Sequence, residues 1–412
     1  MGRSIAFEPF DLSHDPHERA AALCPGVGHG PADGDPLVAP LVQSTTYGRS
    51  RVGTDPEHQY SRVSNPTVAT LEQALGRLEH APPAACFTTG LAAETALFLA
   101  VLRAHDHAIC GRSVYGGTVR LLQQVLPELG VETTFVDTTD LDAVRTAVRP
   151  NTRLVFVETP SNPTLEITDI AGVASIARQA GALLAVDNTF LTAALQQPLD
   201  LGADVSVYST TKFVDGHSVA LGGALVSRDT DLLERIRFIR KCTGAIQTPF
   251  NAWLTINGLK TLPLRLERQS ASAQRIAEWL AQHDAVERVR HPSLAEGQQR
   301  TLAETQHAGA HGGVVSFEVA GGLESARRVA ERLELCTLVE HVGSVETLVT
   351  HSASMTHADV PPEQRLACGI SEGLLRLSVG LEPPEAILAD LSQALDAAAG
   401  TSAAPSSALT AC

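Results

Sequence analysis

Short runs of consecutive apolar residues, separated by helix-like segments, constrain the fold of this chain more than any other feature. The clearest runs between about residues 65 and 230 are Ala108–Cys110, Leu154–Val157, Leu183–Val186 and Val205–Tyr208. Runs that are apolar at every position, rather than at alternate positions, are typical of parallel strands covered on both faces. Strands of this kind that alternate with helices predict an α/β fold with a mainly parallel sheet.

The rest of the pattern divides the chain into further parts. Residues 1–64 are rich in Pro, Gly and His and have little helical or strand periodicity, which predicts an N-terminal arm rather than a domain. Asn65-Pro66 is a typical helix start, so we expect a large domain over residues 65–262. Residues 263–400 begin and end with helical patterns around strand-like segments, which predicts a smaller C-terminal α/β domain. The Ala/Ser-rich residues 401–412 are expected to be a disordered tail.

The composition is that of a folded cytoplasmic enzyme. Apolar residues make up 44% of the chain and charged residues 19%, and the net charge is −15. This charge argues against nucleic acid or an anionic membrane as the main partner. The apolar runs are too short to span a bilayer, and the N-terminus lacks the apolar core of a signal peptide. Seven cysteines without a Cys-x-x-Cys pair favour reduced thiols, and together these features predict a cytoplasmic location.

One lysine has the surroundings that a phosphorylated carbonyl cofactor requires. Lys212 lies between the hydroxyl cluster Ser209-Thr210-Thr211 and a glycine-rich stretch, residues 216–223. A lysine amine can form a Schiff base while neighbouring hydroxyls donate hydrogen bonds to phosphate oxygens. Pyridoxal 5′-phosphate (PLP) is the common cofactor that needs both groups. The alternative, a surface lysine after a Ser/Thr turn, is disfavoured by the other candidate parts of a PLP site upstream.

Two carboxylates follow apolar runs directly. Glu158 closes Leu154–Val157 and Asp187 closes Leu183–Val186. Open parallel sheets bind ligands at the carboxyl ends of their strands, and a carboxylate is costly to bury there without a partner. We therefore expect Asp187 to pair with a protonated pyridine nitrogen. The alternative is a helix cap in the sequence Asp-Asn-Thr.

Two glycine-containing segments are suited to bind the phosphate and the ring of the cofactor. Thr89-Gly90-Leu91 resembles a turn that opens a helix, and the N-terminus of a helix binds phosphate readily. An ordinary capped helix is the commoner meaning of such a segment. Tyr115, followed by two glycines, offers a flat ring that could stack on a cofactor ring.

A series of motifs resembles, in order, the Cys/Met metabolism PLP enzymes, from about residue 35 to residue 398. These motifs are Tyr60–Thr67, Thr89–Ala93, Tyr115–Thr118, Glu158–Thr164, Val186–Thr189, Ser209–His217, Gly258–Thr261, Val345–Leu348, Ala353–His357 and Leu375–Glu382. The family contains cystathionine γ-synthases, cystathionine γ-lyases, methionine γ-lyases and O-acylhomoserine sulfhydrylases. The resemblance implies the PLP-dependent transferase fold type I, which is aspartate aminotransferase-like.

The resemblance also implies a role for each site residue. Lys212, Asp187 and Tyr115 would be catalytic: Lys212 would bind the cofactor covalently and move protons, Asp187 would pair with the pyridinium, and Tyr115 would stack on the ring. The other cofactor-binding residues would hold the phosphate, and they are Gly90, Leu91, Ser209 and Thr211, with Tyr60 and Arg62 from a neighbouring subunit. The substrate-binding residues would be Asn162, Glu340, His341 and Arg376. Arg376 would bind the α-carboxylate, although a strand-edge surface arginine is the alternative.

The activity that the resemblance implies is γ-replacement or γ-elimination on homoserine-derived amino acids, of the cystathionine γ-synthase or γ-lyase type. The alternatives within the family are an O-acylhomoserine sulfhydrylase, a methionine γ-lyase or a γ-eliminating enzyme of specialised metabolism. The expected assembly is a homotetramer, a dimer of dimers with shared active sites.

Several positions depart from the family pattern. Gly117 stands where methionine γ-lyases generally have cysteine, which argues against methionine as the main substrate. Glu340 matches the glutamate of cystathionine enzymes and favours a substrate with a distal ammonium. Gln59 replaces an acidic residue and Asn257 an arginine. His341 replaces a common serine; because histidine titrates near neutrality, we expect a pH-dependent element there unless the side chain points to solvent.

Two other classes of protein are alternatives to this interpretation. A metal enzyme is suggested by His105-Asp-His107 and by His341, His351 and His357, but their spacing is not that of a compact ligand set. A nucleotide-binding protein is suggested by Gly26–Gly30, but no apolar strand precedes these glycines and no amphipathic helix follows them. We therefore expect no metal ligands and no bound nucleotide.

Overall fold

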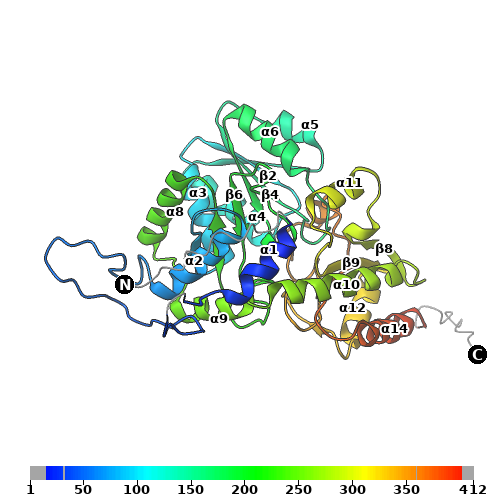
Figure 1. Ribbon diagram of the computed structural model, residues 1–412. Helices are drawn as coiled ribbons and strands as arrows, with labels where there is room; N and C mark the ends of the chain where they lie inside the picture. Colours follow the sequence, from blue (N-terminus) through cyan, green and yellow to red (C-terminus); the bar gives the residue numbers. More distant parts are fainter. Residues whose placement is uncertain (1–14, 31–32, 359, 401–412) are drawn as a thin grey trace, which may run out of the picture.

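Two β-sheets, each packed against helices, make up the protein in a computed structural model that describes residues 15–30, 33–358 and 360–400 (Figure 1). In this part of the chain the larger sheet has seven strands in the order β1-β7-β6-β5-β4-β2-β3. Their bounds are β1 Ala85–Phe87, β2 His107–Gly111, β3 Glu132–Val136, β4 Thr152–Glu158, β5 Leu183–Asp187, β6 Val205–Tyr208 and β7 Gly223–Val226. The expected tail at residues 401–412 lies outside the described residues.

The four apolar runs of the sequence form β2, β4, β5 and β6, which pair in parallel. The prediction of a mainly parallel sheet is therefore confirmed; only β7 runs against its neighbours β6 and β1. Successive residues of β4 pack on opposite faces: Leu154 and Phe156 join one buried apolar cluster, and Val155 and Val157 join another. This two-sided burial explains why the runs are apolar at every position.

Helices cover both faces of the larger sheet. The helices of this half of the chain are α2 Pro66–Leu78, α3 Gly90–Val101, α4 Gly116–Arg120, α5 Leu141–Ala147, α6 Ile170–Ala180, α7 Thr192–Leu195, α8 Thr230–Thr243 and α9 Pro249–Leu259. Residues of α5 and α6 pack on the face that carries Val155, and residues of α3 and α8 pack on the opposite face. Helix α2 begins where the sequence predicted, because the Asn65 side chain accepts hydrogen bonds from the backbone N–H groups of Thr67 and Val68.

The smaller sheet lies on the right of Figure 1 with α12 and α14, away from α3 and α8. Its order is β10-β11-β12-β9-β8, with β8 Val286–Arg290, β9 Val314–Val319, β10 Thr337–Leu338, β11 Leu348–His351 and β12 Leu374–Ser378. The accompanying helices are α10 Leu262–Leu280, α11 Gly297–Gln306, α12 Gly322–Arg332, α13 Pro362–Ala367 and α14 Pro384–Gly400. Apolar residues of α10, α12 and α14 form one core with this sheet.

The N-terminal segment contains a helix that the sequence did not predict, α1 Pro16–Leu23. Arg19 and Ala20 of α1 are buried, and the Arg19 guanidinium donates a hydrogen bond of 2.7 Å to Oε1 of Gln197. The helix therefore owes its place to packing on α7, α2 and α10 rather than to a strong pattern of its own. Residues 33–64 contain no helix and, apart from an isolated bridge between Thr46 and Tyr60, no strand.

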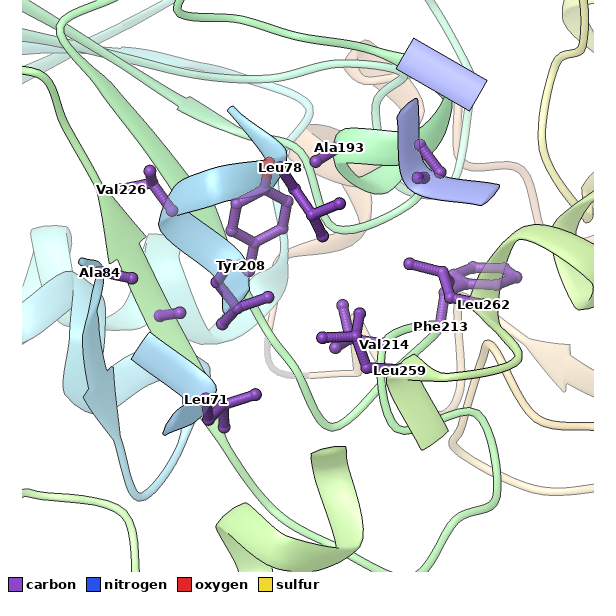
Figure 2. Packing of buried hydrophobic residues seen from close by; sticks show 14 of the residues in the cluster. Leu71, Leu78, Ala84, Ala193, Tyr208, Phe213, Val214, Val226, Leu259 and Leu262 are labelled. Atoms are coloured by element: carbon purple, nitrogen blue, oxygen red, sulfur yellow. The ribbon is translucent and has the colours of Figure 1, made fainter. Parts of the chain in front are cut away.

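A buried apolar cluster joins the two halves of the molecule beneath Lys212. Figure 2 shows Leu71 of α2 and Tyr208 of β6 on one side, and Leu262, which starts α10, on the other. Phe213 and Val214, the two residues after Lys212, lie in the same cluster. The backbone that carries the lysine is consequently held by a core that both sheets share. No helix in the described residues is both long and apolar enough to cross a membrane.

Candidate active site

A cavity of about 440 Å³ brings together most of the side chains that the sequence singled out. Those that line it are Gly90, Leu91, Tyr115, Asn162, Asp187, Ser209, Thr211, Lys212, Glu340, His341 and Arg376. They come from loops at the carboxyl ends of the parallel strands and from the smaller sheet, so the cavity has the location that an α/β sheet predicts for a ligand.

Lys212 follows β6 in a loop that hydrogen bonds and a close backbone contact hold in place. Its backbone N–H donates to the Ser209 carbonyl at 3.2 Å, and Gly343 lies so close that a Cβ there would be 2.6 Å from the Phe213 nitrogen. The Lys212 amine lies 3.1 Å from Nδ1 of His341. Burial, with a contribution from the positive charge of Arg376, lowers the pKa of Lys212 to about 8. A lysine with this pKa can both accept and donate a proton near neutrality.

The two predicted carboxylates lie side by side at the ends of β4 and β5, where Glu158 and Asp187 are register partners. Oδ1 of Asp187 accepts a hydrogen bond of 2.9 Å from the Thr189 N–H, yet burial raises the pKa of Asp187 to about 6. Helix α7 is capped at Leu191, so Asp187 is not a helix cap. Burial and the neighbouring Asp187 raise the pKa of Glu158. A cation placed between these groups would offset the cost of burying them.

Glu94 is a third buried carboxylate at the cavity, and the sequence analysis did not predict it. Its side chain accepts a hydrogen bond of 2.7 Å from the Thr118 hydroxyl, and burial raises its pKa to about 8. Glu94 lies four residues after Gly90 in α3, one turn along the same face of the helix. That spacing was the signal that could have identified it.

The start of α3 and the loop of Lys212 together form the side of the cavity expected to hold phosphate. The first N–H groups of a helix have no partner within the helix, and α3 begins at Gly90. A Cβ on Gly90 would lie 3.0 Å from Cβ of Ser209, so glycine permits this close approach. The Thr211 hydroxyl lines the cavity but also exchanges hydrogen bonds with the backbone of Gly222.

Tyr115 immediately precedes α4, lines the cavity and is 42% exposed. The Glu158 carboxylate accepts a hydrogen bond of 2.7 Å from the Tyr115 backbone N–H, which fixes the start of α4. A Cβ on Gly117 would lie 2.5 Å from Cε1 of the tyrosine ring. Glycine at position 117 therefore allows the ring to fold back over the first turn of α4.

Arg376 lies in β12, in the middle of the smaller sheet, and is only 2% exposed. The alternative of a strand-edge surface arginine is thus wrong. Its guanidinium donates hydrogen bonds to Oδ1 of Asn162 at 2.8 Å, to the His341 carbonyl at 3.0 Å and to the Thr350 hydroxyl at 3.2 Å. Burial lowers the pKa of Arg376 to about 10, against the influence of Glu158, so it remains a cation at neutral pH.

Tyr60 and Arg62 do not line the cavity of their own chain. Tyr60 is 47% exposed, and the Arg62 guanidinium lies 5.4 Å from the centre of its ring. The same guanidinium donates a hydrogen bond of 2.8 Å to the Lys241 carbonyl. Within one chain, therefore, these two residues are not brought together with the other site residues.

The expectation that His341 titrates near neutrality is wrong. Burial and the positive charges of Lys212 and Arg376 lower the pKa of His341 to about 4, so the ring is uncharged at neutral pH. Three of the other candidate metal-ligand histidines are hydrogen-bonded to protein groups: His107 to Thr152 and Thr134, His351 to Ser354 and the Glu372 carbonyl, and His357 to Thr356. In the described ranges no three His, Cys, Asp or Glu side chains are grouped so as to hold a metal ion.

The lining residues fit PLP. The cavity provides a lysine of lowered pKa, a buried carboxylate for a cationic ring nitrogen, an aromatic ring, and a helix N-terminus beside two hydroxyls. The model of the Cys/Met metabolism PLP-dependent enzyme family matches residues 28–396. The chain belongs to this family.

Relatives of known function cover nearly the whole chain. A cystathionine γ-lyase of Bacillus subtilis is 42% identical over 89% of this chain and 97% of its own length. An L-methionine γ-lyase of Pseudomonas putida is also 42% identical, over 90% of this chain and 96% of its own. The crystal structure of a cystathionine γ-synthase from Xanthomonas oryzae, in complex with aminoacrylate and cysteine, aligns with a TM-score of 0.89 at 39% identity, covering 92% of this chain and 98% of that one. The prediction of PLP-dependent fold type I is confirmed.

The lowered pKa of Lys212 should determine how fast the protein without bound cofactor captures PLP at a given pH. Only an uncharged amine attacks the aldehyde of PLP, so the rate of cofactor capture should rise with pH around a midpoint of about 8, not near the ordinary value of 10.5. Stopped-flow absorbance of added PLP measures this rate. Lys212→Ala should show no covalent capture, and Lys241→Ala, a control at an exposed lysine, should keep the midpoint. A midpoint above pH 10 would contradict the expectation.

Proposed function

We propose that the protein catalyses γ-replacement or γ-elimination on homoserine-derived amino acids, as cystathionine γ-synthases and γ-lyases do. The proposal is supported by one observation above all: Lys212 and Arg376 face one cavity and are both hydrogen-bonded to His341. An α-amino acid whose carboxylate lies on Arg376 would have its Cα within reach of the lysine. PLP, when bound, supplies the electron sink that acidifies the Cα and then the Cβ proton of the substrate.

Lys212 is the proposed proton carrier. An amine with a pKa of about 8 can take the Cα proton and later return a proton at a neighbouring position, because neither form is strongly favoured near neutral pH. Arg376 is the proposed carboxylate ligand. Its guanidinium is held by Asn162, His341 and Thr350, so little conformational entropy is lost when a substrate binds.

The remaining roles follow the chemistry of the cavity. We assign the cationic ring nitrogen to Asp187, because a buried carboxylate with a raised pKa gains most from an opposite charge. Tyr115 is proposed to stack on the cofactor ring. The phosphate is assigned to the N–H groups of Gly90 and Leu91 and to the hydroxyls of Ser209 and Thr211, which lie on one side of the cavity.

Glu340 supports a substrate that carries a distal ammonium. It is an exposed carboxylate at the cavity, and an exposed charge can attract such a group without the cost of burial. Gly117, which leaves space for the ring of Tyr115, takes the place of the cysteine expected of a methionine γ-lyase. We therefore favour a cystathionine-type substrate over methionine.

We also propose that the active unit is a dimer within a homotetramer and that Tyr60 and Arg62 complete the phosphate site of a neighbouring subunit. Both residues belong to the segment 33–64, where Leu37 and Val52 are exposed at 70% and 105%. Such a segment gains stability by packing on another surface. A two-fold contact would complete both sites together.

The activity is tested by product analysis. The purified holoenzyme should form 2-oxobutyrate and ammonia from cystathionine, or cystathionine from an O-acylhomoserine and cysteine. Each substrate is assayed with and without cysteine, so that elimination and replacement are separated. Release of pyruvate from cystathionine would indicate β-cleavage and contradict the proposal, as would turnover restricted to methionine.

Asp187→Asn should retain PLP but slow the exchange of the substrate α-proton with deuterated solvent. Asparagine is nearly isosteric but cannot hold the ring nitrogen protonated by an opposite charge. Since an opposite charge shifts a neighbouring pKa by about 1–3 units, we expect a loss of about tenfold to a thousandfold. The control is Asp200→Asn, in an exposed ion pair with Arg228, which should exchange at the rate of the unmodified protein. Unchanged exchange in Asp187→Asn would assign the role to another group.

Shared active sites are tested by mixing two variants that are each impaired alone. Arg62→Ala should weaken PLP retention because a charge-assisted phosphate contact is lost, and Lys212→Ala should abolish turnover. A mixed dimer contains one site with an intact Lys212 and an intact Arg62 from the other subunit. Activity should therefore return on subunit exchange, measured by turnover of differently tagged mixtures. Mixed dimers that form but stay inactive would rule out sharing.

A further inference from the structure

Residue 341 contacts both groups on which the proposed function rests. Nδ1 of its imidazole lies 3.1 Å from Nζ of Lys212, and its backbone carbonyl accepts a hydrogen bond of 3.0 Å from Arg376. The side chain belongs to the loop between β10 and β11, next to Gly343, whose lack of a Cβ lets the loop lie against the Lys212 backbone. The imidazole is therefore held against the lysine by the backbone of its own loop.

The direction of the hydrogen bond follows from the groups involved. A lysine ammonium has three donors and no acceptor, so Nδ1 must accept whenever Lys212 is protonated. The imidazole proton is then on Nε2, which is buried and has no hydrogen-bond partner among the described residues. The ring therefore interacts with Lys212 through the Nδ1 lone pair alone, as a hydrogen-bond acceptor.

The charges around the ring keep it in this neutral form. Lys212, from the loop after β6, and Arg376, from β12, both oppose protonation, whereas Glu346 of the same loop favours it. Glu340, the preceding residue, is exposed. An imidazolium would direct a second N–H donor, on Nδ1, at the Lys212 ammonium and would bury a charge next to two cations. The ring thus accepts a hydrogen bond from the Lys212 ammonium but does not take up its proton.

We propose that His341 is a positioning residue for Lys212: its neutral imidazole accepts a hydrogen bond from the lysine amine whenever that amine is not bound to the cofactor, while its backbone carbonyl aligns Arg376. The proposal deepens the proposed function, on which it rests. After the substrate amine has displaced Lys212, the free side chain must remain over Cα to take a proton from it. The imidazole limits where the amine can move and favours the protonated form that results.

Three substitutions separate the hydrogen bond from the shape of the ring. His341→Phe keeps a ring without nitrogen. His341→Asn and His341→Ser shorten the side chain but keep a polar atom: the amide of asparagine branches from Cγ as Nδ1 does, and serine offers a hydroxyl. The matched control is His283→Phe, which removes an imidazole that packs on Trp279 and does not line the cavity. Circular dichroism and PLP content establish that each variant is folded and loaded.

The first readout does not depend on catalysis. A hydrogen bond to the charged form raises the pKa of an amine, so its loss should lower the pKa of Lys212. In full-length protein freed of PLP, the pH midpoint of PLP capture should therefore fall by about one unit in His341→Phe, since hydrogen bonds to charged groups correspond to shifts of about 1–2 pH units. At least one of His341→Asn and His341→Ser should return it toward that of the unmodified protein, and His283→Phe should not change it.

The second readout is exchange of the substrate α-proton in the loaded enzyme. His341→Phe should slow exchange by about tenfold to a hundredfold, mainly in the rate at saturating substrate rather than in the substrate concentration at half-maximal rate. An unchanged midpoint in His341→Phe would overturn the proposal. So would a midpoint shift that neither polar variant reverses, because the ring would then act by its shape. If the unmodified protein exchanges no α-proton, the proposed function fails, and the capture midpoint alone still decides the role of His341.

Discussion

The burial of Arg376 is the constraint on which the rest of the site depends. A guanidinium in the middle of a sheet is costly to remove from water unless its donors are paired. Here the partners come from different parts of the molecule: Asn162 from the loop after β4 of the larger sheet, and Thr350 and the His341 carbonyl from the smaller sheet and its β10–β11 loop. These bonds pair both terminal nitrogens of the guanidinium, whereas Nε has no partner among the described residues. Bringing the three partners around one cation therefore requires the two sheets to meet at a defined distance.

A second bond strengthens the same junction. The Ser316 hydroxyl, in β9 beside Arg376, donates a hydrogen bond of 2.6 Å to the Pro163 carbonyl, in the loop that carries Asn162. Beneath it, the apolar cluster around Phe213 holds the loop of Lys212 in a core shared by α2 and α10. The residues that line the cavity are thus held both by the polar contacts of Arg376 and Ser316 and by the apolar cluster around Phe213. Its polar groups are consequently placed by rigid neighbours, which is what proton transfer and carboxylate binding require.

Much of the site could be predicted from local patterns. Strand-ending carboxylates at residues 158 and 187 become neighbours because parallel strands in register end at the same edge of a sheet. Gly90 of α3 and the hydroxyls of Ser209 and Thr211 lie close together for a similar reason, because both groups lie at the same edge of the sheet. Glu94 was missed because a glutamate in an apolar helix can face either a core or a cavity, and its spacing of four residues from Gly90 was the one sign that it faces the cavity. The pKa of His341 was wrongly expected because it depends on burial and on two cations from distant segments.

The sequence by itself determined the α/β class, the parallel strands, the helix that starts at Pro66 and the family, because each depends on the periodicity of apolar residues, on local capping or on short motifs. Only the tertiary structure decided that α1 forms and where it docks, that Arg376 is buried rather than on a sheet edge, and that His341 lies against Lys212 as an uncharged ring. These features arise from contacts between residues far apart in the chain, where burial and neighbouring charge outweigh local preference.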